Sequence, residues 1–87
     1  MESLEAASKF AALAQETRIE VMRLLAEQGT TGMAAGDLAS KLGQAPSTLS
    51  FHLSALEQAG LVQSTRQGRR VIYAVRFAGL RNLFAFL

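Results

Sequence analysis

Apolar residues recur at helical spacing between residues 45 and 59, and this stretch is the clearest pattern in the chain. At about 100° per residue, one stripe of the predicted helix is formed by three leucines, Leu49, Leu53 and Leu56. Pro46 stands at the first helical turn and Gly60 follows the last residue, which are the usual boundary signals of a helix. His52 lies beside the stripe, where packing near the turn is the simplest interpretation of a helical histidine.

The opposite face of this predicted helix carries no charge. Around it lie four short hydroxyl side chains and one aromatic ring, Ser47, Thr48, Ser50, Ser54 and Phe51. A solvated helix face usually carries Lys and Glu, so an uncharged face indicates a surface that reads a partner. Short hydroxyls can approach base edges and phosphates, and the Phe51 ring can lie against a thymine methyl. The alternative is an ordinary amphipathic core helix with a polar back.

The pattern predicts three helices before this one, over residues 2–14, 16–28 and 34–42. Gly29 and Gly43 end the second and third of them. Only Gln44 and Ala45 then separate the third helix from the helix that starts at Pro46. Two helices joined by such a short turn are typical of a helix-turn-helix, whose second helix enters the major groove.

After Gly60 the periodicity changes to that of strands. Residues 61–65 and 70–75 are rich in β-branched and aromatic side chains, and they flank a turn at Gln67-Gly68. We expect a two-stranded hairpin, or wing, with an arginine-rich tip formed by Arg66, Gln67, Gly68, Arg69 and Arg70. A last helix is predicted over residues 77–87. The expected fold is mainly α, a winged helix-turn-helix with five helices and a small β-hairpin.

Two helices carry more apolar surface than one small domain can cover. The first has two apolar sides, and only one of them can face the core of its own domain. The last carries five large apolar residues on one broad arc. We therefore expect a homodimer that forms through the first and last helices. The residues predicted to lie between subunits are Leu4, Leu13, Leu80, Leu83, Phe84 and Leu87.

Composition narrows the class of protein. The 87 residues suffice for a single domain, residues 1–87, and no apolar run is long enough for a transmembrane span. No secretion signal is recognisable. The chain has no cysteine and one histidine, which excludes disulfides, thiolate metal sites and a histidine-rich metal site within it. We expect a cytoplasmic protein with no cofactor, no metal and no membrane partner.

The charge is distributed unevenly, although the net charge is only +2. Residues 1–60 contain all seven acids and four bases, a balance of −3. Residues 61–87 contain five arginines and no acid, a balance of +5. An arginine-rich segment without acids is a candidate surface for a polyanion. The alternative is chance clustering in a short segment.

Three blocks in order carry a resemblance to a known family: A-L-A-Q-E-T-R-I-E-V-M-R-L-L, D-L-A-S-K-L-G-Q-A-P-S-T-L-S-F-H-L-S-A-L-E-Q-A-G-L-V and R-Q-G-R-R-V-I-Y. Over residues 12–73 the chain resembles the ArsR/SmtB family of bacterial winged-helix repressors. The resemblance implies a homodimer that binds an operator with two half-sites through residues 46–59 and the wing at 66–70, and that releases it when an inducer binds. It assigns base contacts to Pro46, Ser47, Ser50 and Phe51, and wing contacts to Gln67, Arg69 and Arg70.

The chain departs from the family pattern in two places. Ala45 and Pro46 replace the usual serine and glutamine, which leaves the amides of Ser47 and Thr48 free for a DNA phosphate. Metal-sensing relatives carry Cys-x-Cys on the third helix, or acids and histidines on the last, whereas this chain carries the residues Ala34, Gly36, Arg81 and Asn82 there. No inducer site is recognisable. The F-H-L sequence and the apolar end resemble arsenite-responsive repressors, so a cysteine-containing sensor tail beyond residue 87 is an open alternative.

Two other classes of function, an enzyme and a protein-binding module, are alternatives to DNA binding. An enzyme is not expected, because no nucleophile–base pair, paired carboxylates or phosphate loop is present. His52 alone does not make a catalytic site. A winged helix that binds a protein and never touches DNA is the remaining alternative, and the arginine-rich tip beside an uncharged hydroxyl face argues against it.

Overall fold

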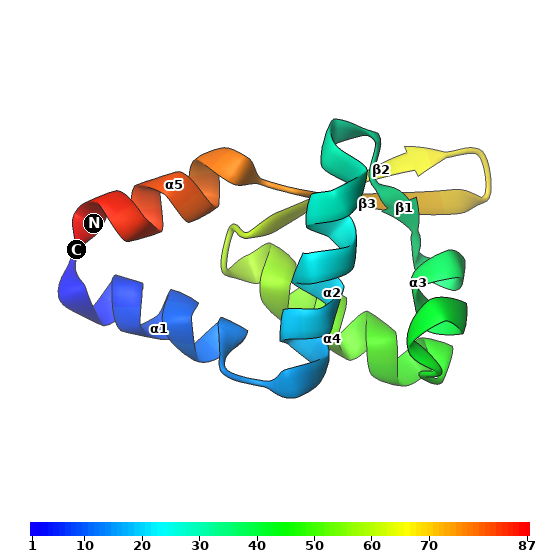
Figure 1. Cartoon of the computed structure of the whole chain (residues 1–87), viewed down its shortest axis with the longest axis horizontal. Coiled ribbons are helices and arrows are strands. Elements are labelled where there is room, and N and C mark those ends of the chain that lie inside the picture. Colours follow the sequence, from blue (N-terminus) through cyan, green and yellow to red (C-terminus); the bar gives the residue numbers. More distant parts are fainter.

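The computed structural model of the protein describes all residues, 1–87, and contains five helices and three strands (Figure 1). In chain order the elements are α1 (Ser3–Leu13), α2 (Glu16–Gln28), a 3₁₀ turn (Gly29–Thr31), β1 (Met33–Ala34), α3 (Ala35–Leu42), α4 (Pro46–Gln58), β2 (Val62–Gln67), β3 (Arg70–Val75) and α5 (Phe77–Phe86). The five predicted helices and the hairpin are therefore confirmed, and most predicted boundaries are correct to within a residue or two.

The molecule has two ends with different architecture. α1 and α5 lie side by side at one end, where the two chain termini also meet, and α3, α4 and the hairpin extend toward the other (Figure 1). The rings of Phe10 and Phe84 join α1 to α5 in an edge-to-face contact, with centroids 6.1 Å apart. This layout separates the apolar terminal helices from the elements expected to meet DNA.

The three strands form one antiparallel sheet in the order β1-β3-β2. β2 and β3 pair from Val62 opposite Val75 to Gln67 opposite Arg70. β1 adds two further pairs, Met33 with Tyr73 and Ala34 with Ile72. The predicted two-stranded wing is therefore present, and β1 is a third strand that was not predicted. A strand of two residues is too short to show the alternation by which strands are recognised in a sequence.

Two glycines allow close backbone approaches that fix this architecture. Gly32 has φ of +70°, and a Cβ atom there would collide with the backbone carbonyl of Tyr73. A Cβ atom at Gly79 in α5 would collide with the carbonyl of Gly60, in the turn that follows α4. Gly32 thus lets β1 reach β3, and Gly79 lets α5 pack against the C-terminal end of α4.

The core lies where α2, α3, α4 and α5 meet the sheet. Its fully buried side chains are almost all leucine: Val21, Leu25, Leu38, Leu49, Leu53, Leu56, Leu61, Val62 and Leu83. Each such side chain contributes about 1.5–3 kcal/mol when it leaves water. The leucine stripe predicted for α4 is among them, so the helix turns its opposite face outward.

The position of Leu83 differs from the predicted subunit interface. It is fully buried within its own chain, so the prediction that it lies between subunits is wrong. Leu13 and Leu80 are half-buried and also pack against the core. The spacing of apolar residues shows which of them share a helix face, but it does not tell whether the same chain or a partner covers that face.

The C-terminal end of α4 is held by α1. The Lys9 Nζ donates to the carbonyl of Ala59 at 2.6 Å, where a cation also favours the helix dipole. The Arg76 amide donates to the carbonyl of Leu61 at 2.9 Å, which ties the start of α5 to the same turn.

None of the helices has both the length and the apolar character needed to cross a membrane.

Candidate nucleic-acid interface

The turn between α3 and α4 is built by Gly43. This residue is left-handed, with φ of 62° and ψ of 33°, and its amide and that of Gln44 donate to the last carbonyls of α3. α4 then begins at Pro46, after Ala45, which makes no side-chain capping bond. The helix-turn-helix predicted from the short spacing is therefore present.

The N-terminal end of α4 offers backbone donors. Pro46 has no amide hydrogen, and the first amide of the helix that is bonded is that of Leu49, to Ala45. The amides of Ser47 and Thr48 have no hydrogen-bond partner within the chain. Free amides at the positive end of a helix dipole favour an anion.

The outward face of α4 carries the side chains that the sequence singled out. Pro46, Ser47, Thr48, Ser50, Phe51 and Ser54 are all exposed, and no acid lies among them. Phe51 is 67% exposed, which is unusual for a large apolar side chain. Most of the ring therefore faces solvent, and within the chain it lies beside Arg18 and His52.

Arg18 on α2 contacts this face, a relationship that the sequence prediction missed. Its Nε donates to the Nδ1 of His52 at 3.0 Å, and its guanidinium carbon lies 5.6 Å from the centroid of the Phe51 ring. His52 is buried and its ring meets that of Phe51 at 5.7 Å. The only signal in the sequence was the histidine beside the leucine stripe, which was interpreted as packed near the turn.

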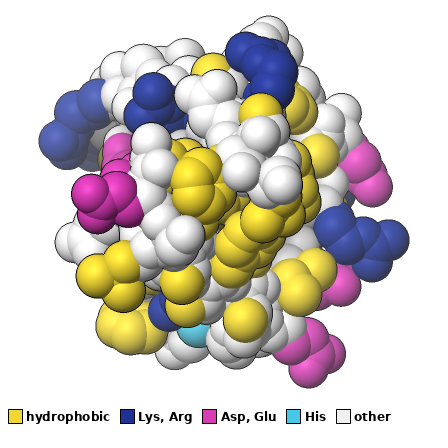
Figure 2. Space-filling view, turned by 90° about the vertical axis from the view of Figure 1, so that its left-hand side faces the viewer, with side chains coloured by type: hydrophobic (Ala, Val, Ile, Leu, Met, Phe, Trp, Pro, Cys, Tyr) yellow, Lys and Arg dark blue, Asp and Glu magenta, His cyan; other side chains and the backbone are white.

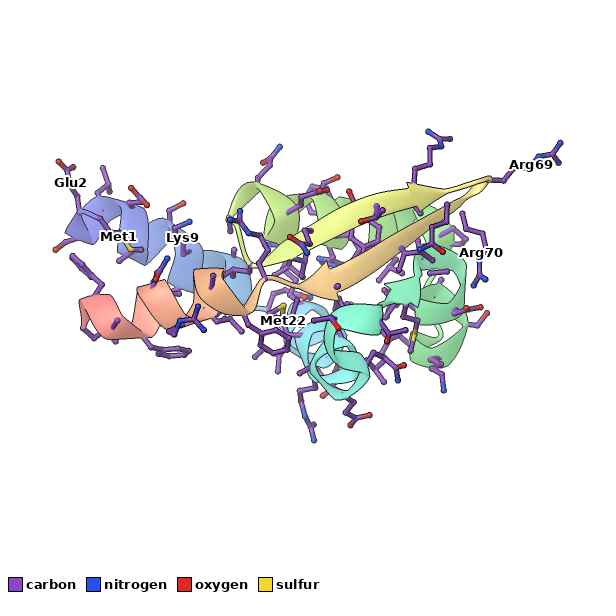
Figure 3. The ribbon with its side chains drawn as sticks, turned by 90° about the horizontal axis from the view of Figure 1, so that it is seen from above. Met1, Glu2, Lys9, Met22, Arg69 and Arg70 are labelled. Atoms are coloured by element: carbon purple, nitrogen blue, oxygen red, sulfur yellow. The ribbon has the colours of Figure 1, made fainter.

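The wing presents its cations in two different ways. Arg66, Gln67, Arg69 and Arg70 are all exposed, with Gly68 at φ of 64° in the turn. Arg69 projects from the tip of the wing, whereas Arg70 points back toward α3 (Figure 3). There Arg70 Nη2 donates to Asp37 Oδ2 at 2.8 Å. The sequence prediction treated the two arginines as equivalent, and the structure distinguishes them.

A groove of about 710 Å³ separates the wing from α3. Its polar lining includes Lys41, Gln67 and Arg70, and Asp37 is its one acidic residue. Because Arg70 pairs with Asp37, Lys41 is the one cation of the lining that no carboxylate engages.

A second polar pair lies where α4 meets the sheet. Ser64 Oγ donates to Glu57 Oε2 at 2.7 Å. Burial, and to a smaller extent the carboxylate of Glu57, raises the pKa of the Tyr73 phenol above its ordinary value of 10.0. Tyr73 is paired with Ser64 across the strands, so this cluster joins the end of α4 to the wing.

An apolar surface covers the end formed by α1 and α5 (Figure 2). Its large exposed side chains are Met1, Leu4, Phe77, Phe84, Phe86 and Leu87. Leu4 and Leu87 are each 82% exposed, and alanines at positions 7, 11 and 14 extend the surface along α1. Of the six residues predicted at a subunit interface, Leu4, Phe84 and Leu87 keep enough exposed surface to meet a partner, whereas Leu83 does not.

No three of the His, Asp and Glu side chains come together in a group that could hold a metal ion. Neither the single histidine nor any carboxylate pair is placed as an acid–base centre. His52 is engaged by Arg18, and Glu57 and Asp37 are engaged by Ser64 and Arg70.

Comparison with known proteins agrees with this architecture. Residues 15–64, more than half of the chain, match the family described as "Bacterial regulatory protein, arsR family". The arsenical resistance operon repressor of Escherichia coli (strain K12) is 38% identical over 64 residues, which cover 74% of the chain and 53% of that protein.

Two experimental structures are similar over nearly the whole chain. An ArsR-like transcriptional regulator from Rhodococcus sp. RHA1 is 38% identical with a TM-score of 0.81, over 97% of this chain and 76% of that one. A homodimeric winged helix-turn-helix DNA-binding domain from Mycobacterium bovis is 34% identical with a TM-score of 0.80, over 94% and 73% of the two chains. These relatives are transcriptional regulators and not enzymes. With its helix-turn-helix, its wing and its matching sequence, the chain belongs to the ArsR family of bacterial transcriptional regulators.

Proposed function

We propose that the protein is a homodimeric repressor that binds double-stranded operator DNA, with α4 in the major groove of each half-site and the wing on the phosphate backbone. The observation that carries this proposal is the exposed, uncharged face of α4 beside an arginine-bearing wing. The N-terminal end of α4 and the tip of the wing both lie at the end of the molecule away from α1 and α5 (Figure 1).

Each part of this surface suits a different part of the duplex. The hydroxyls of Ser47 and Ser50 can donate to and accept from base edges, and the Phe51 ring can pack on a thymine methyl. The free amides of Ser47 and Thr48 suit a phosphate at the entry to the groove. Arg69 adds a cation that no carboxylate neutralises, which suits the next phosphate along the backbone.

The apolar surface on α1 and α5 supports the dimer. Leu4, Phe84 and Leu87 are exposed on one end of the molecule, and leaving such side chains in water is unfavourable. A two-fold dimer through this end would present two copies of α4 to two half-sites of an operator. The homodimeric state of the M. bovis domain supports the same arrangement.

A response to arsenite is the second candidate function. The match to the arsenical resistance operon repressor favours it, but this chain spans about half the length of that repressor and holds no cysteine. For the chain of 87 residues, micromolar zinc, cadmium or arsenite should therefore leave DNA affinity unchanged. A saturable loss of affinity that a chelator or thiol reverses would show that an inducer site exists within it.

Selection from a pool of randomised duplexes, followed by mobility-shift titration, tests the proposal. The protein should enrich a two-fold symmetric sequence and bind it as two chains per duplex, with at least about 10³-fold preference over a scrambled duplex. The DNA upstream of the protein's own gene is the first natural candidate. Failure to enrich any sequence, with the protein folded, would favour a winged helix that binds a protein partner instead.

A further inference from the structure

The side chain of Arg18 joins α1, α2 and α4 beside the outward face of α4. From α2, its Nε donates to His52 Nδ1 in α4 at 3.0 Å, and its Nη1 donates to the carbonyl of Ala12 in α1 at 3.5 Å. Its guanidinium lies over the Phe51 ring at 5.6 Å. Its own amide is fixed by the side chain of Gln15, which accepts at 3.0 Å. One residue thus touches the end of α1 and two neighbouring positions of the recognition helix.

Arg18 forms no ion pair. The two ion pairs of the structure join Arg23 to Glu20 and Arg70 to Asp37, so the partners of Arg18 are a ring nitrogen, a carbonyl and an aromatic face. Such partners add little electrostatic stabilisation, but they constrain direction because a guanidinium is planar and donates in fixed directions. The contacts therefore point to an orienting role for this side chain.

The hydrogen bond also fixes the state of His52. The Nδ1 of His52 accepts in this bond, which requires the tautomer that carries its hydrogen on Nε2. The imidazole in turn meets the Phe51 ring at an angle of 64°. Arg18 and His52 together restrict where this exposed ring can lie.

We propose that Arg18 is a positioning residue for DNA recognition. It orients Phe51 through His52 and ties the rotation of α4 to the C-terminal end of α1. Because α1 belongs to the apolar surface proposed to form the dimer, the same contact links the spacing of the two recognition helices to the subunit interface. The inference rests on the proposed function, since it assigns a role within DNA binding by α4.

Four variants separate the contribution of the hydrogen bond from that of the charge of Arg18. His52→Leu removes the acceptor and keeps an apolar side chain of similar size, whereas His52→Asn keeps a polar atom close to the position of Nδ1. Arg18→Met removes the charge and all donors, and Arg18→Lys keeps the charge without the planar donor group. Each is titrated against the duplex that the wild-type protein selects from a randomised pool and against a scrambled duplex of the same length. Melting temperature and sedimentation report folding and dimer formation.

The preference for the selected duplex should fall about 10-fold in His52→Leu, Arg18→Met and Arg18→Lys, as expected for a displaced base contact. His52→Asn should keep most of the preference for the selected duplex. The slope of log affinity against log salt on the scrambled duplex should not change, because a positioning residue neutralises no phosphate.

Several results would overturn the proposal. A slope that shrinks by about 0.9 per site in Arg18→Met but not in His52→Leu would make Arg18 a phosphate contact instead. An unchanged preference in folded, dimeric His52→Leu, or a loss in His52→Asn equal to that in His52→Leu, would remove the role of the hydrogen bond. If Arg18→Met does not fold, the two His52 variants still decide. A wild-type protein that selects no sequence would overturn the proposed function itself, and this inference with it.

Discussion

Arg70 of the wing and Asp37 of α3 form an ion pair, with Nη2 and Oδ2 2.8 Å apart. Both side chains are more than half exposed, at 63% and 60%, so the pair contributes little to stability, about 0.2–1 kcal/mol at most. Its consequence is electrostatic. The carboxylate neutralises Arg70 in the free protein, whereas Arg69 at the tip keeps its full charge.

The wing arginines should therefore differ in the salt dependence of DNA binding. Arg69→Ala should reduce the slope of log affinity against log salt by about 0.9 per site, or about 1.8 for a dimer, on specific and random duplexes alike. Arg70→Ala should reduce the slope less, because Asp37 already compensates its charge. Asp37→Asn should raise affinity for random DNA and steepen the slope, since it frees a cation.

Titration of the three variants between about 50 mM and 200 mM salt measures these slopes. Asp37→Asn combined with Arg70→Ala is the matched control, because with both groups removed the gain from freeing Arg70 should disappear. Equal slopes for Arg69→Ala and Arg70→Ala would show that DNA binding opens the ion pair and uses both arginines.

Dimer formation should depend on the apolar surface of α1 and α5. Leu4 is 82% exposed, so Leu4→Glu should fold normally, yet it places a charge in the proposed interface. The variant should sediment as a single 9.3 kDa chain at micromolar concentration, whereas the wild type should have twice that mass. Ser40→Glu, which adds the same charge at an exposed position of α3, away from α1 and α5, should remain a dimer. A wild-type protein of 9.3 kDa at this concentration would contradict the dimer.

Most of the helical architecture could be predicted because its signals are local. The leucine stripe of α4, Pro46 at its start and the glycine punctuation all lie within a few residues of the features that they predict. The exposure of Phe51 also followed from helical periodicity alone. The strand β1 did not, because two residues carry no period and its pairing with β3 depends on residues about forty positions away.

The contacts that distinguish individual site residues could not be predicted from the sequence. Arg18 and His52 are 34 positions apart, and Asp37 and Arg70 are 33 apart, so each pair forms only after the helices and the wing have packed. Leu83 illustrates the same limit for an apolar residue. Its helix face was identified correctly, but its burial by its own chain depends on how closely Gly79 lets α5 approach the turn at Gly60.

Tyr73 should make stability depend on pH in the alkaline range. Its pKa is raised above 10.0, first by burial and then by Glu57, so the folded chain holds the phenolic proton where the unfolded chain has lost it. The stabilisation is thus complete below about pH 10 and is lost as the pH rises through the higher pKa of the folded state. Between about pH 8 and pH 11, urea unfolding should show a larger loss of free energy of unfolding for wild type than for Tyr73→Phe. Parallel losses would place the phenol in a water-like environment.

Phe51 is 67% exposed on the outward face of α4. Within the chain its ring contacts Arg18 and His52, and an exposed cation–π contact is worth about 0.5–1 kcal/mol. Phe51→Ala should therefore fold, with a melting temperature lower by only a few degrees. Its affinity for the selected duplex should fall by about 1–3 kcal/mol, the usual cost of a lost base contact.

Binding to random DNA should change little in the same variant, because a phenyl ring neutralises no phosphate. Phe51→Leu is the matched comparison, since it keeps an apolar side chain but cannot present a ring face to Arg18 or a flat surface to a thymine methyl. If the ring reads a base, the loss should concentrate at positions of the selected sequence that carry thymine, and replacing those thymines by uracil should weaken wild-type binding but not Phe51→Ala binding. A variant that loses stability while keeping its preference for the selected duplex would assign Phe51 to folding and not to recognition.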